Sequence, residues 1–288
     1  MFLDISGISI ELVGLKEISA PFALFQDNPK SRISDIRISL EPKPFYPGSH
    51  FKEDNLISQA KGLWAIYNYQ GKLIFKDIFN RRVSNGDSRI CSWDKDSGVV
   101  KLYLNGNSPL GRPLNPLAYP LGPLILLNKL GQKGEFFLHA SGVKCAKDEG
   151  LVFCGNSGSG KSTMARIWLK NRSGTVLNDD RIIVRRSQGR FIAYGCPWYL
   201  KSKKLVSHEK LEIRKLFFLR HSKHNYVKPI EKKAAFWKLI RQAYFPVWDK
   251  EAASKSISFI QDLSQELRCF ELGFRPTPEI IDFIRNIR

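Results

Sequence analysis

One glycine-rich segment constrains this chain more than any other feature of its sequence. Residues 155–163 read GNSGSGKST and match the pattern GxxxxGK[ST] in full. The segment directly follows an apolar run, Leu151–Cys154, and directly precedes a helical pattern, Ser162–Lys170. A strand, a glycine-rich turn and a helix in this order are typical of a phosphate-binding loop. The sequence therefore predicts an α/β domain built around a phosphate site.

The residue types in this segment suit the binding of a nucleotide. Glycine lets backbone N–H groups turn inward around phosphate oxygens, where a side chain would block the approach. Lys161 supplies a cation for the terminal phosphates, and the hydroxyl of Ser162 completes the coordination of a bridging Mg²⁺. A turn without a ligand is the alternative, but it has no need of a Lys-Ser pair. The residues assigned to the nucleotide are Gly155, Asn156, Ser157, Gly158, Ser159, Gly160, Lys161, Ser162 and Thr163.

Two acids follow this loop at short range. Asp179 and Asp180 come eighteen and nineteen residues after Lys161, just past the strand pattern Gly174–Leu177. In a parallel sheet, both acids and the phosphates emerge at the same carboxyl-end crevice. One carboxylate can hold Mg²⁺ and the other can accept the proton of a hydroxyl group. An exposed Asn-Asp-Asp turn is the simpler alternative.

A histidine precedes the loop. His139 lies in the run Phe136–Val143, which we expect to pair beside the strand of the loop. A lone histidine among apolar residues is more often a core residue than a catalytic one. Its place before the loop makes it a candidate for the same site.

The first part of the chain has a different pattern. From Met1 to about Val100, short alternating runs are separated by Asn, Gly, Asp and Pro, which is typical of antiparallel strands. The segment Asn105–Pro123 contains five prolines and three glycines, so it is a candidate linker. We place the boundary near Pro116. The sequence thus predicts a β-rich domain over residues 1–115 and an α/β domain over residues 116–288.

Composition narrows the protein class. The 288 residues carry 46 Lys and Arg against 27 Asp and Glu, a net charge of +19, which favours anionic partners. No zinc finger or aromatic RNA-binding pattern accompanies this charge, so the sequence argues against a nucleic-acid partner. The five cysteines show no CxxC spacing and favour a reducing compartment. Without an apolar run of about 20 residues or a signal peptide, we expect a cytoplasmic protein with no membrane insertion.

Three motifs together resemble those of a known family. They are LHASGV from Leu138, GNSGSGKST from Gly155 and TVLNDDR from Thr175. In order and spacing they are similar to the HPr kinase/phosphorylase superfamily, particularly its shorter HPr-kinase-like members. The resemblance covers about residues 118–288 and is sharp between His139 and Arg181. It implies a P-loop kinase domain related to ATP-dependent phosphoenolpyruvate carboxykinase. This domain would follow the smaller, mainly β N-terminal domain that the strand pattern predicts.

The resemblance also implies a role for each site residue. The loop glycines and Lys161 would contact the phosphates of ATP, and Ser162 would hold Mg²⁺. Asp179 would be the base that takes the hydroxyl proton, and Asp180 would belong to the metal side. His139 would orient or tune the base. Relatives in this family often assemble, so the resemblance is compatible with a homo-oligomer.

Two hypotheses of different classes follow from these residues. The first is an ATP-dependent kinase whose acceptor is a serine of a small protein or modified peptide, with a small-molecule hydroxyl as the alternative acceptor. The second is a module that binds a peptide and uses the nucleotide only as a switch. The acid pair and His139 favour the kinase, because a switch does not require them. The family signature for phosphate removal is incomplete, since Glu212-Ile213-Arg214 is followed by Lys215. The sequence does not identify the acceptor, and it does not show whether the protein prefers ATP or GTP.

Overall fold

The computed structural model describes residues 1–18, 20–28, 33–41, 53–78, 88–105, 115–145, 149–198 and 205–287. These residues divide into two compact units, Met1–Leu126 and Leu127–Arg288. The division falls within helix α1 (Leu121–Gly131). Part of the predicted linker, residues 106–114, lies outside the described residues. The boundary near Pro116 therefore stays a prediction.

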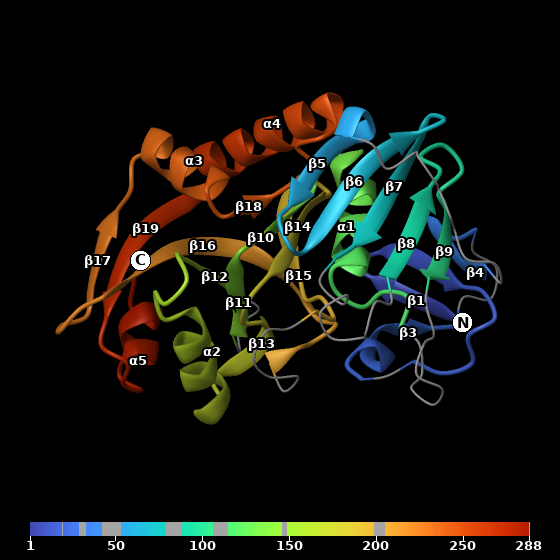
Figure 1. The fold of residues 1–288 in the computed structure, drawn as a ribbon. Helices are drawn as coiled ribbons and strands as arrows, with labels where there is room; N and C mark the ends of the chain where they lie inside the picture. Colours follow the sequence, from blue (N-terminus) through green and yellow to red (C-terminus); the bar gives the residue numbers. More distant parts are fainter. Residues whose placement is uncertain are drawn as a thin grey trace. The chain divides into compact units, whose positions relative to one another are not determined.

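The first unit is built on one sheet in the order β3-β1-β2-β4-β9-β8-β7-β6-β5 (Figure 1). Strands β5 to β9 form an antiparallel meander, as their alternating sequence predicts. The pairs β2·β4 and β4·β9 are parallel, so the expected antiparallel domain is a mixed sheet. The strands are β1 (Phe2–Ile5), β2 (Ile8–Leu12), β3 (Gln26–Asp27), β4 (Ile36–Glu41), β5 (Leu56–Ala60), β6 (Trp64–Tyr69), β7 (Lys72–Asp77), β8 (Ser88–Trp93) and β9 (Val99–Asn105). Short 3₁₀ helices cover Phe22–Phe25 and Glu53–Asn55.

A buried ion pair joins the end of β7 to the start of β8 in this sheet. The Nη2 and Nε atoms of Arg89 lie 2.6 and 2.9 Å from Asp77 Oδ2, and the Asp77 side chain is 1% exposed. The same guanidinium group donates to the backbone carbonyl of Tyr119 at 2.8 Å. Arg89 therefore joins two strands to the segment that leads to α1.

The second unit is a mixed sheet in the order β13-β11-β12-β16-β15-β14-β10-β18, with β19 paired to β16 and β17 to β19. Its strands are β10 (Phe136–Leu138), β11 (Ala140–Cys145), β12 (Glu149–Cys154), β13 (Gly174–Asn178), β14 (Ile182–Ser187), β15 (Arg190–Tyr194), β16 (Lys210–His221), β17 (Tyr226–Pro229), β18 (Ala243–Tyr244) and β19 (Arg268–Phe274). The predicted run Phe136–Val143 is two strands rather than one. Only β11 pairs beside β12, whereas β10 pairs with β14 and β18.

Helices cover both faces of this sheet (Figure 1). One core cluster joins the sheet to α3 (Lys232–Ile240) and α4 (Lys250–Glu266), and the other joins it to α2 (Lys161–Lys170) and α5 (Ile280–Arg285). The second unit is thus an α/β domain with three layers. In the described part of the chain, no helix has the length and apolar character needed to cross a membrane.

The helices form where the sequence gives them one apolar face. In α2, Met164, Ala165 and Trp168 are buried at helical spacing. In α4, Phe259, Ile260 and Leu263 are buried, and the Asp249 carboxylate caps the first turn by accepting from the Ala252 N–H at 3.1 Å. Burial of these faces holds α2, and with it the loop that precedes α2, against the sheet.

Candidate active site

The glycine-rich loop connects the end of β12 to the start of α2, as the sequence predicts. Gly158 and Gly160 have φ angles of +84° and +102°, which side chains rarely allow, and Gly160 is the N-cap residue of α2. The Lys161 ammonium group donates to the carbonyls of Gly155 at 2.6 Å and Asn156 at 3.0 Å. The cation therefore lies inside the curve of the loop.

The direction of the strands brings the other candidate residues to this loop. β12 and β13 each run antiparallel to β11, so they are parallel to one another although β11 lies between them. The loop after β12 and the acids after β13 therefore open at the same edge of the sheet. β11 runs the opposite way, which places its first residues, next to His139, at that edge too. The sequence predicted a parallel sheet here, and the structure has a mixed one with the same outcome.

A cavity of about 230 Å³ lies where these segments meet. Its lining includes eight predicted residues of the loop and acid pair, together with His139 and Arg166, a helix residue that was not predicted. The lining is His139, Ser157, Gly158, Gly160, Lys161, Ser162, Thr163, Arg166, Asp179 and Asp180. The predicted loop residues Gly155, Asn156 and Ser159 do not line it. The first two of them contact the Lys161 ammonium group instead.

Asn178 fixes the turn that carries the two acids. Its side-chain N–H₂ group donates to the carbonyls of Cys196 at 3.0 Å and Trp198 at 2.9 Å. Its side-chain oxygen accepts from the backbone N–H groups of Asp180 at 2.9 Å and Arg181 at 3.2 Å. The sequence analysis did not assign this residue. Its burial is a property of the fold, and no local motif marked it in the sequence.

Asp179 is a buried carboxylate without a hydrogen-bonding partner. Its residue is 1% exposed, and neither of its oxygens is hydrogen-bonded within the described part of the chain. Burial raises the pKa of this carboxyl above its usual range, and the nearby Ser162 hydroxyl offsets part of that rise without reaching hydrogen-bond geometry. The charge of Asp180 raises the pKa further. Two acceptor oxygens are thus held beside the loop with no donor.

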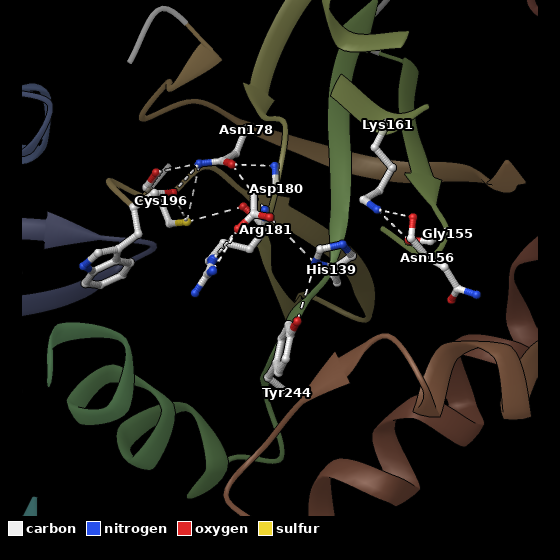
Figure 2. A network of polar contacts seen from close by, with 10 residues as sticks. His139, Gly155, Asn156, Lys161, Asn178, Asp180, Arg181, Cys196 and Tyr244 are labelled. Atoms are coloured by element: carbon white, nitrogen blue, oxygen red, sulfur yellow. Dashed lines mark hydrogen bonds and ion pairs between the residues drawn. The ribbon is translucent and has the colours of Figure 1, made fainter. Parts of the chain in front are cut away.

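Asp180 lies in a different environment (Figure 2). The Nε and Nη2 atoms of Arg181 are 2.9 and 2.8 Å from its Oδ2 oxygen, and His139 Nδ1 is 3.8 Å from its Oδ1 oxygen. Burial and the charge of Lys161 lower the pKa of His139, with Asp180 opposing them in part. The imidazole is therefore neutral at neutral pH and lies beside the carboxyl group of Asp180.

Strand β18 supports the site from a second direction. The backbone N–H of His139 donates to the Gln242 carbonyl at 2.8 Å, and the Gln242 side chain donates to Asn156 Oδ1 at 2.9 Å. The Tyr244 hydroxyl lies 3.5 Å from His139 Nδ1. At the far side of the loop, His221 Nε2 is 2.6 Å from the Gly158 carbonyl oxygen. None of these supporting residues carried a motif that the sequence analysis could have used.

The acids and the loop also limit which metal the site suits. Among the described residues no group of three or more His, Cys, Asp and Glu side chains is placed to hold an ion. Mg²⁺ commonly takes only one or two protein oxygens and completes its shell with water and phosphate. The two unpartnered oxygens of Asp179, near the Ser162 hydroxyl, fit such a ligand set.

Comparison with known proteins identifies no family for this chain. No family model matches it, and no curated protein matches it. Among solved structures, it is similar to the HPr(Ser) kinase/phosphatase from Coxiella burnetii, with 11% sequence identity and a TM-score of 0.33. The match covers 52% of this chain and 94% of that one. The function of this protein is therefore argued from its own residues.

Proposed function

We propose that this chain is a kinase that transfers the γ-phosphoryl group of ATP to a hydroxyl group, with a serine of a peptide or small protein as acceptor. One observation carries the proposal. Six residues of the glycine-rich loop and a pair of carboxylates line the same cavity. Binding a nucleotide requires the loop, but two acids beside the terminal phosphates are needed only when a metal is held and a proton is removed.

The contacts favour a definite role for each acid. Asp179 has two buried oxygens without hydrogen bonds and lies near Ser162, so these two residues would hold Mg²⁺. When bound, Mg²⁺ would neutralise charge on the phosphates. Asp180 is the acid that lies next to His139, so it would take the hydroxyl proton. This is the reverse of the order that the resemblance implied for the two acids.

The surrounding cations would position Asp180 and the phosphates. Arg181 contacts the Oδ2 oxygen of Asp180, whereas the Oδ1 oxygen lies 3.8 Å from Nδ1 of the neutral imidazole of His139. The Lys161 ammonium group would exchange its contacts with the loop carbonyls for contacts with the β- and γ-phosphates. Arg166, which lines the cavity one turn after Ser162, would add a second cation there. Positioning and charge neutralisation supply most of the rate in such reactions.

The transfer step balances with these residues alone. The acceptor oxygen attacks the γ-phosphorus as its proton passes to Asp180, and a new O–P bond forms. The bond between the γ-phosphorus and the β,γ-bridging oxygen breaks, and ADP leaves with that electron pair. Lys161 offsets the charge that develops on the leaving oxygen.

The test separates binding from transfer. ATP affinity is measured by calorimetry with and without Mg²⁺, and transfer is measured with γ-labelled ATP and an arrayed library of serine-containing peptides. We expect Asp180→Asn to bind Mg²⁺-ATP normally and to lose transfer by about 10²-fold or more. We expect Asp179→Asn to lose the part of ATP affinity that depends on Mg²⁺. Asp282→Asn, which removes an exposed acid on α5, is the matched control.

Two results would overturn the proposal. Undiminished transfer by the Asp180→Asn variant would remove the role of base. ATP hydrolysis by the wild type with no labelled peptide in the array would favour the nucleotide switch instead.

A further inference from the structure

A second charged cavity lies at the other end of the strands of the same sheet, away from the glycine-rich loop. We call it the basic hollow. It is a cavity of about 930 Å³, and the cations that line it are Lys144, Arg190, Lys210, Arg214, Lys215 and Arg268. Arg268 is the first residue of β19, and Lys210 is the first residue of β16. Both strands run parallel to β12, whose far end carries the phosphate loop. The basic hollow is therefore separate from the candidate active site.

The charges of the basic hollow are only partly neutralised. Glu212 is the one acid among its described lining residues, and it lies 3.1 Å from both Arg190 and Arg214. Glu209, outside the lining, lies 3.4 Å from Lys144. Six cations and one lining acid leave a local charge of +5, or +4 when Glu209 is included.

Three of the six cations, Lys210, Lys215 and Arg268, have no ion pair within the described residues. Lys215 donates to the carbonyl of Ile287, which does not neutralise its charge. Unpaired cations that line one cavity repel each other, and an anionic ligand relieves that repulsion. The basic hollow thus has the charge of a site for an anionic ligand.

The arrangement of the cations favours spaced carboxylates over one dense anion. The six side chains come from β11, β15, β16 and β19, and neighbouring strands in a sheet are about 4.8 Å apart. Glu212 lies among them and repels a compact cluster of phosphates. Guanidinium groups form paired hydrogen bonds with carboxylates as they do with phosphates, so the spacing of the cations, and not their type, favours carboxylates spread along a peptide. The half-buried side chains of Ile192 and Tyr194 also line the hollow and offer apolar contact to the side chains of a peptide.

We propose that the basic hollow docks an acidic segment of the peptide or protein acceptor. This inference rests on the proposed kinase function and names the class of its substrate. β16 runs from Arg214 beside the hollow to His221 beside Gly158, seven residue steps or roughly 23 Å at about 3.3 Å per residue. An extended acceptor spans that distance with at least about seven residues. The acidic segment therefore lies that far in sequence from the serine that is phosphorylated.

The first experiment measures docking without phosphotransfer. The probe is a fluorescein-labelled peptide with six glutamates in an eight-residue block, followed by a glycine-serine spacer and one serine, and its binding is read by anisotropy. We expect Lys210→Gln/Arg268→Gln to weaken binding about tenfold. Lys170→Gln/Lys232→Gln removes the same charge from exposed sites outside the hollow, and we expect it to weaken binding less than about twofold. Lys161→Ala, in the phosphate loop, leaves peptide binding unchanged.

Two outcomes of this experiment would overturn the docking proposal. Equal weakening by the two double variants would show that the overall charge, not the hollow, attracts the peptide. Tighter binding of a single-stranded RNA of equal charge, lost in Lys210→Gln/Arg268→Gln, would make the hollow a nucleic-acid site.

A second experiment separates this proposal from the kinase proposal. Phosphotransfer is compared between peptides with spacers of two and of ten residues between the acidic block and the serine. We expect the longer spacer to lower the KM for peptide, and Lys210→Gln/Arg268→Gln to remove that gain without changing the KM for ATP. Peptide binding without any transfer would defeat the kinase proposal alone. Transfer with no effect of the spacer or of the double variant would defeat the docking proposal alone.

Discussion

Two glycines of the phosphate loop differ in what surrounds them, and this difference allows a sharp test of the structure. Both have positive φ angles, +84° at Gly158 and +102° at Gly160. A Cβ atom at Gly158 meets no atom within 4 Å, whereas one at Gly160 would lie 2.6 Å from Cζ of Phe274. Phe274 is 1% exposed and belongs to the core beneath α2 and α5, so its ring has little room to move. Alanine at the two positions should therefore have different consequences.

The expected loss of stability follows from these surroundings. The left-handed backbone conformation costs a non-glycine residue about 1–2 kcal/mol, and both variants carry that cost. The clash with Phe274 adds about 1–3 kcal/mol to Gly160→Ala only, as for other overpacked cores. We expect the free energy of unfolding to fall by about 1–2 kcal/mol in Gly158→Ala and by about 2–5 kcal/mol in Gly160→Ala.

The loss of ATP affinity should have the opposite order and be larger in Gly158→Ala than in Gly160→Ala. Both glycines line the cavity, but a Cβ atom at Gly158 enters open space whereas one at Gly160 meets Phe274. We therefore expect Gly158→Ala to narrow the cavity and to weaken ATP binding. Urea denaturation of the full chain gives the stability of each variant, and calorimetry gives ATP affinity. A third variant, Gly160→Ala/Phe274→Leu, tests the cause of the clash, and we expect it to be more stable than the two single changes predict together. Equal stability of the two alanine variants, or strict additivity in the double variant, would refute the reasoning.

Two further predictions concern buried charge. Arg89→Met removes the cation that faces the buried carboxylate of Asp77 and should cost about 3–5 kcal/mol in urea denaturation. Arg89→Lys should recover little of this loss, because lysine cannot make the forked contacts. A loss below about 1 kcal/mol in Arg89→Met would contradict this. Burial and the charge of Lys161 lower the pKa of His139 in the folded protein, so the histidine binds a proton more readily in the unfolded protein. The free energy of unfolding should therefore fall as the pH drops below about 6.5. His139→Gln should lose less stability than the wild type between about pH 7 and pH 5, and equal losses in thermal unfolding would contradict it.

Local signals explain which parts of the fold could be predicted. The strand, loop and helix at residues 149–170 follow from a motif whose residues are contiguous, and the structure has them where the sequence indicates. Helix α4 was missed, because its buried face includes Ser256 and Ser264 beside Phe259 and Leu263. Serines at core positions weaken the apolar periodicity on which such predictions depend. Helix α3 ends at Ile240, since β18 pairs with β10 immediately afterwards.

The sequence predicted the motif residues of the candidate site. It did not predict the residues that hold these motif residues in place. Gly160, Lys161 and the two acids belong to patterns that can be found in a sequence. Asn178 and Gln242 act through hydrogen bonds to segments that only the folded chain brings near them. Their residue types are common in loops and strands, so nothing local distinguishes them from solvent-exposed amides.

Strand direction explains why the predicted site nevertheless comes together. The sequence predicted that the strands before the loop and before the acids belong to one parallel sheet, and in the structure β11, which runs the opposite way, lies between them. Convergence at one edge requires only that β12 and β13 run the same way, and two strands antiparallel to a common neighbour must do so. The intervening strand adds something that direct neighbours would not, because its reversed direction brings the residue before it, His139, to the same edge as the acids. The histidine and the carboxylate of Asp180 can therefore meet only because the sheet is mixed.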